Sequence, residues 1–457
     1  MFNQSITVRM GLLLLLIIAV EAFVLLHVLG LGYVKLEHHD HQVYERLAIN
    51  MMEHSTFSMD HAPPLRPTIF RPPGYPAFIA LVYTLFGRSV MAVRVAQFVL
   101  LWLTAWLLYM LGTRFVDRHS ATVAALLCAT YPPFVFMATL YSTTPLLLFL
   151  VVLIILAVAL LTSQASPRLL YFLLVGLAIG ALALVRPGFE VLAAPLSGVI
   201  LFGKAQPTIK RRIFSATALI IGCGLMIGPW IIRNNLVSEH QSGLRLMVAG
   251  WGLYTSALQY RGDISYRMLK PEWDLLIADF NRRNQEAAEA MPDRFSADGK
   301  LQNPYAQAQR ELWVERSYIH DSLQIFNTLT WRHILPDFVH RVFWLWSTSD
   351  VSPWQTGAFH RFVQGYHVVL AALVLWGCYL CRSVIFQHTL LWVVAVYQML
   401  LHLVFHVEAR YSLEARLFLL IYAGVGLSYL ISRLRQKSVT GQAASLDSAT
   451  LPRGEVH

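Results

Sequence analysis

The residues best suited to chemistry lie just past the first long apolar run of the chain. Asp40 sits in the polar stretch 38–48, and Tyr44 follows it at helical i+4 spacing. This pattern predicts a short helix with Asp40 at its start. Aspartate is a good helix N-cap, and a carboxylate at a membrane boundary can also accept a proton as a general base. Residue type alone leaves both roles open for Asp40.

Arginines follow this polar stretch along the chain. Arg66 and Arg71 flank a proline-stiffened segment that runs on to Tyr75 and Pro76, and Arg94 lies near the start of the next apolar run. Proline restricts the backbone and so lowers the entropy lost when a neighbouring side chain is held in place. The planar guanidinium group of arginine pairs well with phosphate. The cluster therefore indicates an anionic ligand at the membrane surface, with anchoring to lipid headgroups as the alternative.

The composition is that of a membrane protein. Of 457 residues, 56% are hydrophobic and 14% are charged, and the mean hydropathy is +0.52. Soluble domains carry about 25% charged residues. Apolar runs of about 18 residues recur without the alternation of barrel strands, which predicts an all-α polytopic membrane protein. The expected spans, about ten in number, are residues 10–34, 91–113, 120–137, 145–163, 168–185, 188–203, 213–232, 362–381, 389–406 and 416–432.

The distribution of Lys and Arg predicts the orientation of the spans. Basic residues collect in alternate connections, for example around Lys210 and after Arg433. Cytoplasmic loops carry such an excess, so we expect both termini inside. The net charge of +10 has the same explanation, and no nucleic-acid partner is predicted. We expect one transmembrane domain over residues 1–437 and a disordered cytoplasmic tail at 438–457.

Three segments fall on the outer side of the membrane in this topology: residues 35–74, 233–361 and 407–415. The short links 138–144 and 186–188 fall on the same side. The long segment 233–361 shows helical periodicity, and its stretch 331–346 is rich in aromatic residues. Such a helix is expected to lie in the membrane interface. The apolar stretch Tyr75–Phe86 is short for a span and predicts a re-entrant or interfacial helix, or a tilted extension of the next span.

Histidines around Asp40 raise the question of a metal site. His38, His39 and His41 are close in sequence, and adjacent side chains on a helix point in different directions. The sequence contains no second cluster of spaced ligands of the kind that zinc requires. We therefore predict no metal and no certain cofactor.

An ordered set of motifs resembles the GT-C membrane glycosyltransferases. The closest branch is the group of protein O-mannosyltransferases and lipid A aminoarabinose transferases, glycosyltransferase family 39-like. The motifs are Asp40-x-x-x-Tyr44-x-x-Leu47-Ala48, Phe57-Ser58, Arg71-Pro-Pro-Gly-Tyr-Pro76, Val93-Arg94-x-x-Gln97, Tyr131-Pro132-Pro133, Leu184-Val185-Arg186-Pro187, Gly228-Pro229-Trp230-x-x-Arg233-Asn234 and Glu408-Ala409-Arg410-Tyr411. They cover most of the membrane part, and their order is more specific than any single motif.

The resemblance implies a GT-C-like bundle with juxtamembrane helices and a large extracytoplasmic loop, in the inner (plasma) membrane with its active face outside. It implies inverting transfer of a hexosyl or pentosyl group from a polyprenyl-phosphate donor to a glycan, lipid or protein acceptor, among membrane lipids. Asp40 would be the base or the acceptor-orienting carboxylate. The arginines implied for the donor phosphate are Arg71, Arg94, Arg186, Arg233 and Arg410. The implied supporting residues are Tyr44, Arg66, Tyr75 and Tyr411.

The sequence departs from the family pattern at two positions. His41 follows Asp40 where an acidic residue is common, and Thr144 precedes Pro145 where a glutamate is common. A second catalytic carboxylate is therefore not assigned.

Two other classes of function remain open. A transporter or flippase of lipid-linked sugars would also need about ten helices, but would place charge near the bilayer midplane, where only Glu21 fits. A non-catalytic protein of an envelope assembly machine is the third alternative.

Overall fold

The described part of the chain is helical throughout. The computed structural model describes residues 4–30, 39–164, 166–203, 208–265, 270–293, 296, 301–347, 358–402 and 404–449, and these residues form no β-strand. The expectation of an all-α polytopic membrane fold is confirmed. His38 and residues 450–457, which the sequence analysis discussed, lie outside the described residues.

Six helices of the described residues are long and apolar enough to cross a membrane. These spans are Thr7–Val28 in α1 (Gln4–Phe23) and the π-helix η1 (Val24–Val28), α4 (Val90–Phe115), α7 (Thr144–Thr162), α10 (Ile209–Val237), Arg361–Leu380 in α15 (Ala358–Leu380), and Ala409–Gln436 in η5 (Ala409–Ser412) and α17 (Leu413–Ala449). A seventh span forms if α5 (Arg118–Ala129) and α6 (Pro132–Thr139) count as one, with a bend of 41° between them.

The predicted count of about ten spans is not confirmed, because several apolar segments are short or broken. The four shorter apolar helices are α3 (Gly74–Phe86), α8 (Leu169–Val185), the 3-10 helix η3 (Phe189–Leu192) with α9 (Ala193–Phe202), and the 3-10 helix η4 (Ile385–His388) with α16 (Thr389–Leu401). The bend between α5 and α6 precedes Pro132, since proline cannot continue a preceding helix. The structure agrees with the sequence on where the apolar segments lie, but not on how many span alone.

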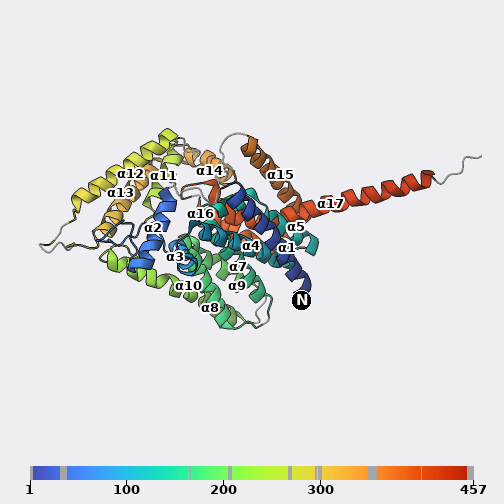
Figure 1. The fold of residues 1–457 in the computed structure, drawn as a ribbon, viewed down its shortest axis with the longest axis horizontal. Helices are drawn as coiled ribbons and strands as arrows, with labels where there is room; N and C mark the ends of the chain where they lie inside the picture. Colours follow the sequence, from blue (N-terminus) through green and yellow to red (C-terminus); the bar gives the residue numbers. More distant parts are fainter. Residues whose placement is uncertain are drawn as a thin grey trace, which may run out of the picture.

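The C-terminal segment also differs from the expectation. The tail 438–457 was predicted to be disordered, but α17 remains helical as far as Ala449. The stretch from Leu413 to Ala449 contains no proline, so no residue within it forbids the helical backbone. Figure 1 shows this helix projecting away from the bundle.

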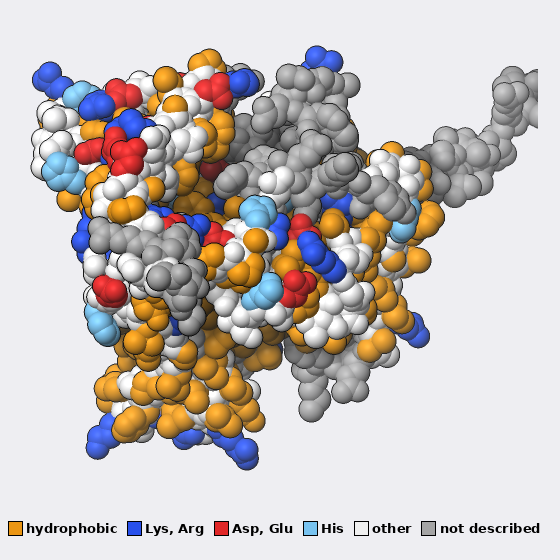
Figure 2. Space-filling view, turned by 60° about the vertical axis from the view of Figure 1, so that its left-hand side comes forward, with side chains coloured by type: hydrophobic (Ala, Val, Ile, Leu, Met, Phe, Trp, Pro, Cys, Tyr) orange, Lys and Arg blue, Asp and Glu red, His pale blue; other side chains and the backbone are white. Residues whose placement is uncertain are grey.

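The remaining helices gather at one end of the bundle. They are α2 (His39–His54), which packs on α3, and the four helices of the long segment: α11 (Gly250–Arg261), α12 (Lys270–Ala290), α13 (Ala306–Thr328) and α14 (Trp331–Leu345). Figure 1 shows α11, α12 and α13 side by side at this end. Figure 2 shows an apolar surface below them with basic side chains at its lower tip, while acidic and basic side chains mix at the upper left. This end therefore forms a polar cap on an apolar bundle.

Helix α14 has the two faces expected of an interfacial helix. Leu335, Val339 and Phe343 are exposed by more than half, whereas Asp337 and Arg341 are buried. The buried face is fixed by ion pairing between the Arg341 Nε and the Asp337 carboxylate at 2.8 Å. The position of α14 in the membrane interface stays a prediction.

Glycines allow α8 and α10 to pack closely. Gly176 and Gly180 form a Gly-x-x-x-Gly pattern on α8, which faces Gly222 on α10. A Cβ atom at Gly176 would lie 2.0 Å from the carbonyl oxygen of Leu219, and a Cβ atom at Gly222 would lie 2.2 Å from that of Leu173. Small residues at a helix crossing let the backbones approach, which is a common way of packing helices in lipid. This contact holds the helix that ends at the candidate site.

The first prediction tests this packing. Gly176→Val should force α8 and α10 apart and lower the free energy of unfolding by about 1–3 kcal/mol. Thermal unfolding of the purified protein in detergent measures the effect. Gly224→Val on the same α10 is the control, because a Cβ atom there meets nothing within 4 Å. Equal unfolding temperatures for the two variants would contradict the close contact.

Candidate functional site

Asp40 forms an ion pair with Arg71. The carboxylate Oδ1 of Asp40, on the second residue of α2, contacts the Nη2 of Arg71 in the loop before α3. The guanidinium carbon of Arg71 also lies 4.9 Å from the ring centroid of Phe70 and 5.7 Å from that of Tyr44. Both partners keep partial exposure, at 34% for the Asp40 side chain and 23% for the Arg71 side chain. Asp40 therefore lies inside α2, and its carboxylate reaches another segment.

Buried aromatic and amide groups connect this pair to the helices of the bundle. Tyr44 packs edge-on against Tyr75 at 5.1 Å between ring centroids, and Tyr75 is fully buried. The Tyr75 hydroxyl donates to Gln97 Oε1 of α4 at 2.7 Å, and Gln97 Nε2 donates to the carbonyl of Ala138 at 3.0 Å. This chain of contacts fixes α2 and α3 on the membrane bundle.

A second ion pair joins Glu408 and Arg410 just before α17. The Nε of Arg410 lies 2.5 Å from Oε2 of Glu408, and the Nε2 of His406 lies 3.1 Å from Oε1 of the same carboxylate. Burial alone would raise the pKa of Glu408, but the charge of Arg410 and the contact with His406 lower this pKa to about 2. Glu408 is therefore ionised at neutral pH.

A third ion pair, between Arg186 and Glu414, also contacts Tyr411. Arg186, the C-cap residue directly after α8, places Nη1 2.7 Å from Oε1 of the fully buried Glu414. The guanidinium carbons of Arg186 and Arg410 each lie 5.4 Å from the ring centroid of Tyr411. The ring of His402 stacks on Tyr411 at 4.9 Å with an interplanar angle of 4°. Tyr411 thus links the two arginines.

The Asp40–Arg71 pair lies within the electrostatic influence of Arg410 in the Glu408–Arg410 pair. Burial lowers the pKa of Arg71, and the positive charge of Arg410 lowers it further. Electrostatic interactions with Tyr44 and Asp40 raise this pKa, and the net result is a raised pKa. Arg410 therefore lies close enough to influence Arg71. Among the predicted site residues, the structure brings together Asp40, Tyr44, Arg71, Tyr75, Arg186, Arg410 and Tyr411.

Two of the predicted phosphate arginines are placed differently. Arg233 donates to the backbone carbonyls of Thr68 at 2.6 Å and Phe57 at 3.3 Å, and it stacks over Trp230 at 4.8 Å. Arg233 therefore holds the loop that precedes Arg71. Arg94 is only 2% exposed in α4.

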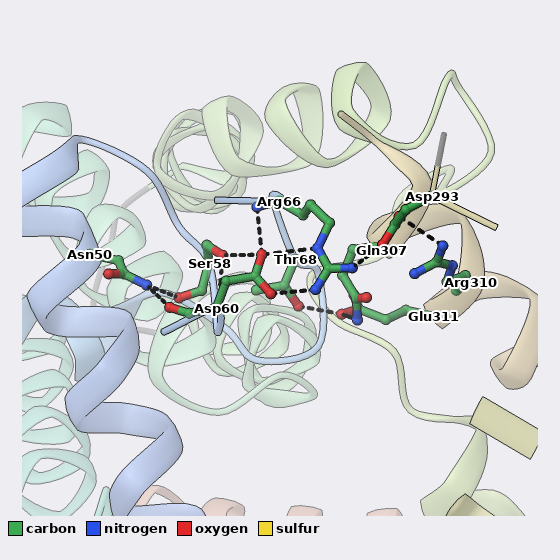
Figure 3. Close-up of polar contacts among 9 residues, drawn as sticks. All are labelled: Asn50, Ser58, Asp60, Arg66, Thr68, Asp293, Gln307, Arg310 and Glu311. Carbon is green, nitrogen blue, oxygen red and sulfur yellow. Dashed lines mark hydrogen bonds and ion pairs between the residues drawn. The ribbon is translucent and has the colours of Figure 1, made fainter. Parts of the chain in front are cut away.

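Arg66 forms its ion pairs within the loop that precedes Arg71 and with the segment that follows α12. It contacts Asp60 Oδ1 at 2.5 Å and Asp293 Oδ2 at 2.7 Å, and Asp293 Oδ1 is bound in turn by Arg310 at 2.8 Å (Figure 3). Asn50 of α2 donates to the carbonyl of Ser58 in the same loop at 2.8 Å. These contacts join the first polar segment to the end of α12 and to α13.

Glu311 is a buried anchor that the sequence analysis did not identify. Its Oε1 accepts the Thr68 hydroxyl at 2.5 Å and its Oε2 accepts the Ile69 amide at 2.7 Å (Figure 3 draws the first). Glu311 is 5% exposed on α13. It therefore fixes the backbone two residues before Arg71. One acidic residue inside a helical stretch carries no sequence signal for this role.

Arg341 binds the backbone of the loop that leads to Glu408, much as Glu311 binds the loop that leads to Arg71. This residue of α14 is 2% exposed and donates to the carbonyls of Phe405 at 3.0 Å, His402 at 3.3 Å and Ser256 at 3.0 Å. The carbonyls of His402 and Phe405 belong to the connection that leads to Glu408. The long segment 233–361 thus holds both the loop of Arg71 and the loop of Arg410.

The described residues contain no group of three or more His, Cys, Asp or Glu side chains that could hold a metal ion. The site consists of arginines, carboxylates and tyrosines. Such a set can bind an anionic group and can accept a proton nearby.

Comparisons with known proteins agree with this fold. Residues 70–232 match the family described as dolichyl-phosphate-mannose-protein mannosyltransferase. The archaeal oligosaccharyltransferase AglB from Archaeoglobus fulgidus, in complex with an inhibitory peptide and a dolichol-phosphate, matches with a TM-score of 0.51 and 13% identity, over 98% of this chain and 52% of that chain. The apo form of the oligosaccharyltransferase from the same organism gives a TM-score of 0.52 and 14% identity, over 98% of this chain and 53% of that chain. The chain has the fold of the GT-C membrane glycosyltransferases.

Other comparisons give a lower structural similarity or no match. Apo ArnT from Cupriavidus metallidurans is similar at 15% identity and a TM-score of 0.40, over 91% of this chain and 77% of that chain. The comparison with curated proteins gives no match. The chain spans about half the length of the oligosaccharyltransferase structures. The family match confirms the resemblance over a segment that includes Arg71, Arg94 and Arg186.

The second prediction concerns Glu311. Glu311→Ala should leave the Ile69 amide without its acceptor, so the segment 57–71 should exchange its amide hydrogens at least about tenfold faster, as expected for a local opening. Hydrogen exchange followed by mass spectrometry measures this. Glu289→Ala is the matched control, because this exposed residue of α12 accepts a hydrogen bond from Gln285 on the same helix. Unchanged exchange in 57–71 would show that Glu311 does not hold the loop.

Proposed function

We propose that the protein transfers a sugar from a polyprenyl-phosphate donor to an acceptor on the outer face of the inner membrane. The observation that carries this proposal is the Asp40–Arg71 pair, which lies at the end of an apolar bundle and within the electrostatic range of Arg410. A carboxylate and several arginines at a membrane boundary suit a reaction between a polar acceptor and a lipid-anchored phosphate. The GT-C fold supports the same function.

Asp40 has the role of the base in this proposal. An acceptor hydroxyl gives its proton to the Asp40 carboxylate while its oxygen attacks the anomeric carbon of the donor sugar. The bond between that carbon and the phosphate oxygen breaks, and the polyprenyl phosphate leaves with the electron pair. A single displacement of this kind inverts the anomeric configuration. Arg71 keeps the Asp40 carboxylate in place through their ion pair.

The arginines stabilise the leaving group. Negative charge grows on the phosphate as the sugar departs, and a fixed guanidinium group stabilises it most in a site with little water. Arg71, Arg186 and Arg410 are the arginines that the structure groups around Tyr411 and Asp40. The Nε of Arg71 is buried without a hydrogen-bond partner among the described residues, so a donor group is left for a ligand oxygen. Arg233 and Arg66 support the loop in this account.

The third prediction tests the base. Asp40→Asn should insert and fold like the unchanged protein but lower sugar transfer by about 10²–10⁴-fold, because the amide cannot accept the proton. Membranes of a deletion strain that carries either form are supplied with radiolabelled lipid-linked sugar, and mass analysis of the envelope glycans locates the product.

Asp274→Asn is the matched control, since this exposed carboxylate of α12 pairs with Lys270 on the same helix. Full transfer by the Asp40 variant would exclude the role of Asp40 as the base. Sugar that crosses the membrane without a covalent product would favour transport over transfer.

A further inference from the structure

Two arginines and two glutamates form a repeated arrangement around Tyr411. Arg410 and Arg186 approach the same ring, with 5.4 Å between each guanidinium carbon and the ring centroid. Each arginine is tied to a glutamate of one short segment, Arg410 to Glu408 and Arg186 to Glu414. The two arginines come from opposite parts of the chain, but both tethers come from the seven-residue stretch 408–414.

We propose that Glu408 and Glu414 are positioning residues, which hold Arg410 and Arg186 against Tyr411 so that the two guanidinium groups bind one phosphate. The proposal rests on the proposed function, because the phosphate is taken to be that of the lipid-linked donor. It assigns to this pair of carboxylates a part in binding that neither the motifs nor the comparisons indicate.

The way in which each glutamate binds its arginine fits this role. Glu408 contacts Arg410 at Nε, so the ion pair uses one edge of the guanidinium fork. Arg410 keeps 40% of its side chain exposed and Arg186 keeps 19%. An arginine that is already fixed loses less rotamer entropy when it binds a ligand. The two ion pairs therefore hold both arginines in place and leave part of each arginine side chain exposed to an anion.

Stability alone does not explain Glu414. Its side chain is fully buried, its Oε1 contacts Arg186, and its Oε2 has no hydrogen-bond partner among the described residues. A buried carboxylate with an unsatisfied oxygen is unfavourable compared with an apolar side chain of similar size. A positioning role gives a reason for a charge at this place.

A purely electrostatic effect would have the opposite sign. Glu408 and Glu414 add negative charge close to the expected phosphate, and like charges repel. Removal of either charge would then strengthen phosphate binding. If the glutamates position the arginines, removal of either one should weaken it. The sign of the change in affinity therefore separates the two accounts.

The fourth prediction uses the full chain in detergent, with undecaprenyl phosphate and undecaprenol as probes in a calorimetric binding assay. Glu408→Gln and Glu414→Gln should each weaken binding of undecaprenyl phosphate about tenfold. Binding of undecaprenol should change less than about twofold, because the alcohol lacks the phosphate. A general loss of structure would weaken both lipids alike. Glu286→Gln, which breaks an exposed 2.5 Å ion pair with Arg282 on α12, is the matched control.

Equal or tighter binding of undecaprenyl phosphate by Glu408→Gln would overturn the proposal. If Glu414→Gln fails to fold, Glu408→Gln decides alone, since Glu408 lies outside the membrane spans. A double variant, Arg186→Gln with Arg410→Gln, separates this inference from the proposed function. Unchanged phosphate binding by that double variant would refute the phosphate site itself, whereas loss of binding there with no loss in the glutamate variants would refute only the positioning role.

Discussion

Two loops from distant parts of the chain must be held against each other for the site to exist. The helices of the long segment 233–361 hold them through Glu311 and Arg341. Glu311 binds the backbone just before Arg71, and Arg341 binds the backbone that leads to Glu408. Both anchors are buried, so their loss leaves polar backbone groups unsatisfied in a dry environment. The membrane helices place the loops at one end of the bundle, but these two side chains set how the loops meet.

Each arginine of the site has a carboxylate partner, which explains how so much positive charge is tolerated near apolar sequence. The pairs are Asp40 with Arg71, Glu408 with Arg410, and Glu414 with Arg186. Taken in their ionised forms, these three pairs carry no net charge. A phosphate would enter an arrangement that is already neutral, so its binding depends on the geometry of the guanidinium groups more than on total charge.

Hydropathy predicted the fold class, and the resemblance to a known family supplied most of the residues of the cluster. Hydropathy and basic residues placed Asp40, Arg186 and Arg410 on one side of the membrane, and the structure joins them with Arg71. The sequence could not distinguish an arginine that is proposed to bind phosphate from Arg233, whose donors bind backbone carbonyls. The number of helices that span the membrane alone was not predicted correctly. Breaks at proline and at 3-10 turns divide apolar segments that look continuous in composition.

A structure of the protein with a bound polyprenyl phosphate tests the central claim most directly. The account predicts phosphate oxygens at about 3 Å from guanidinium nitrogens of Arg71, Arg186 and Arg410, with the Asp40 carboxylate facing the same space. A phosphate seated instead at Arg233, with no contact to Arg71 or Arg410, would contradict it.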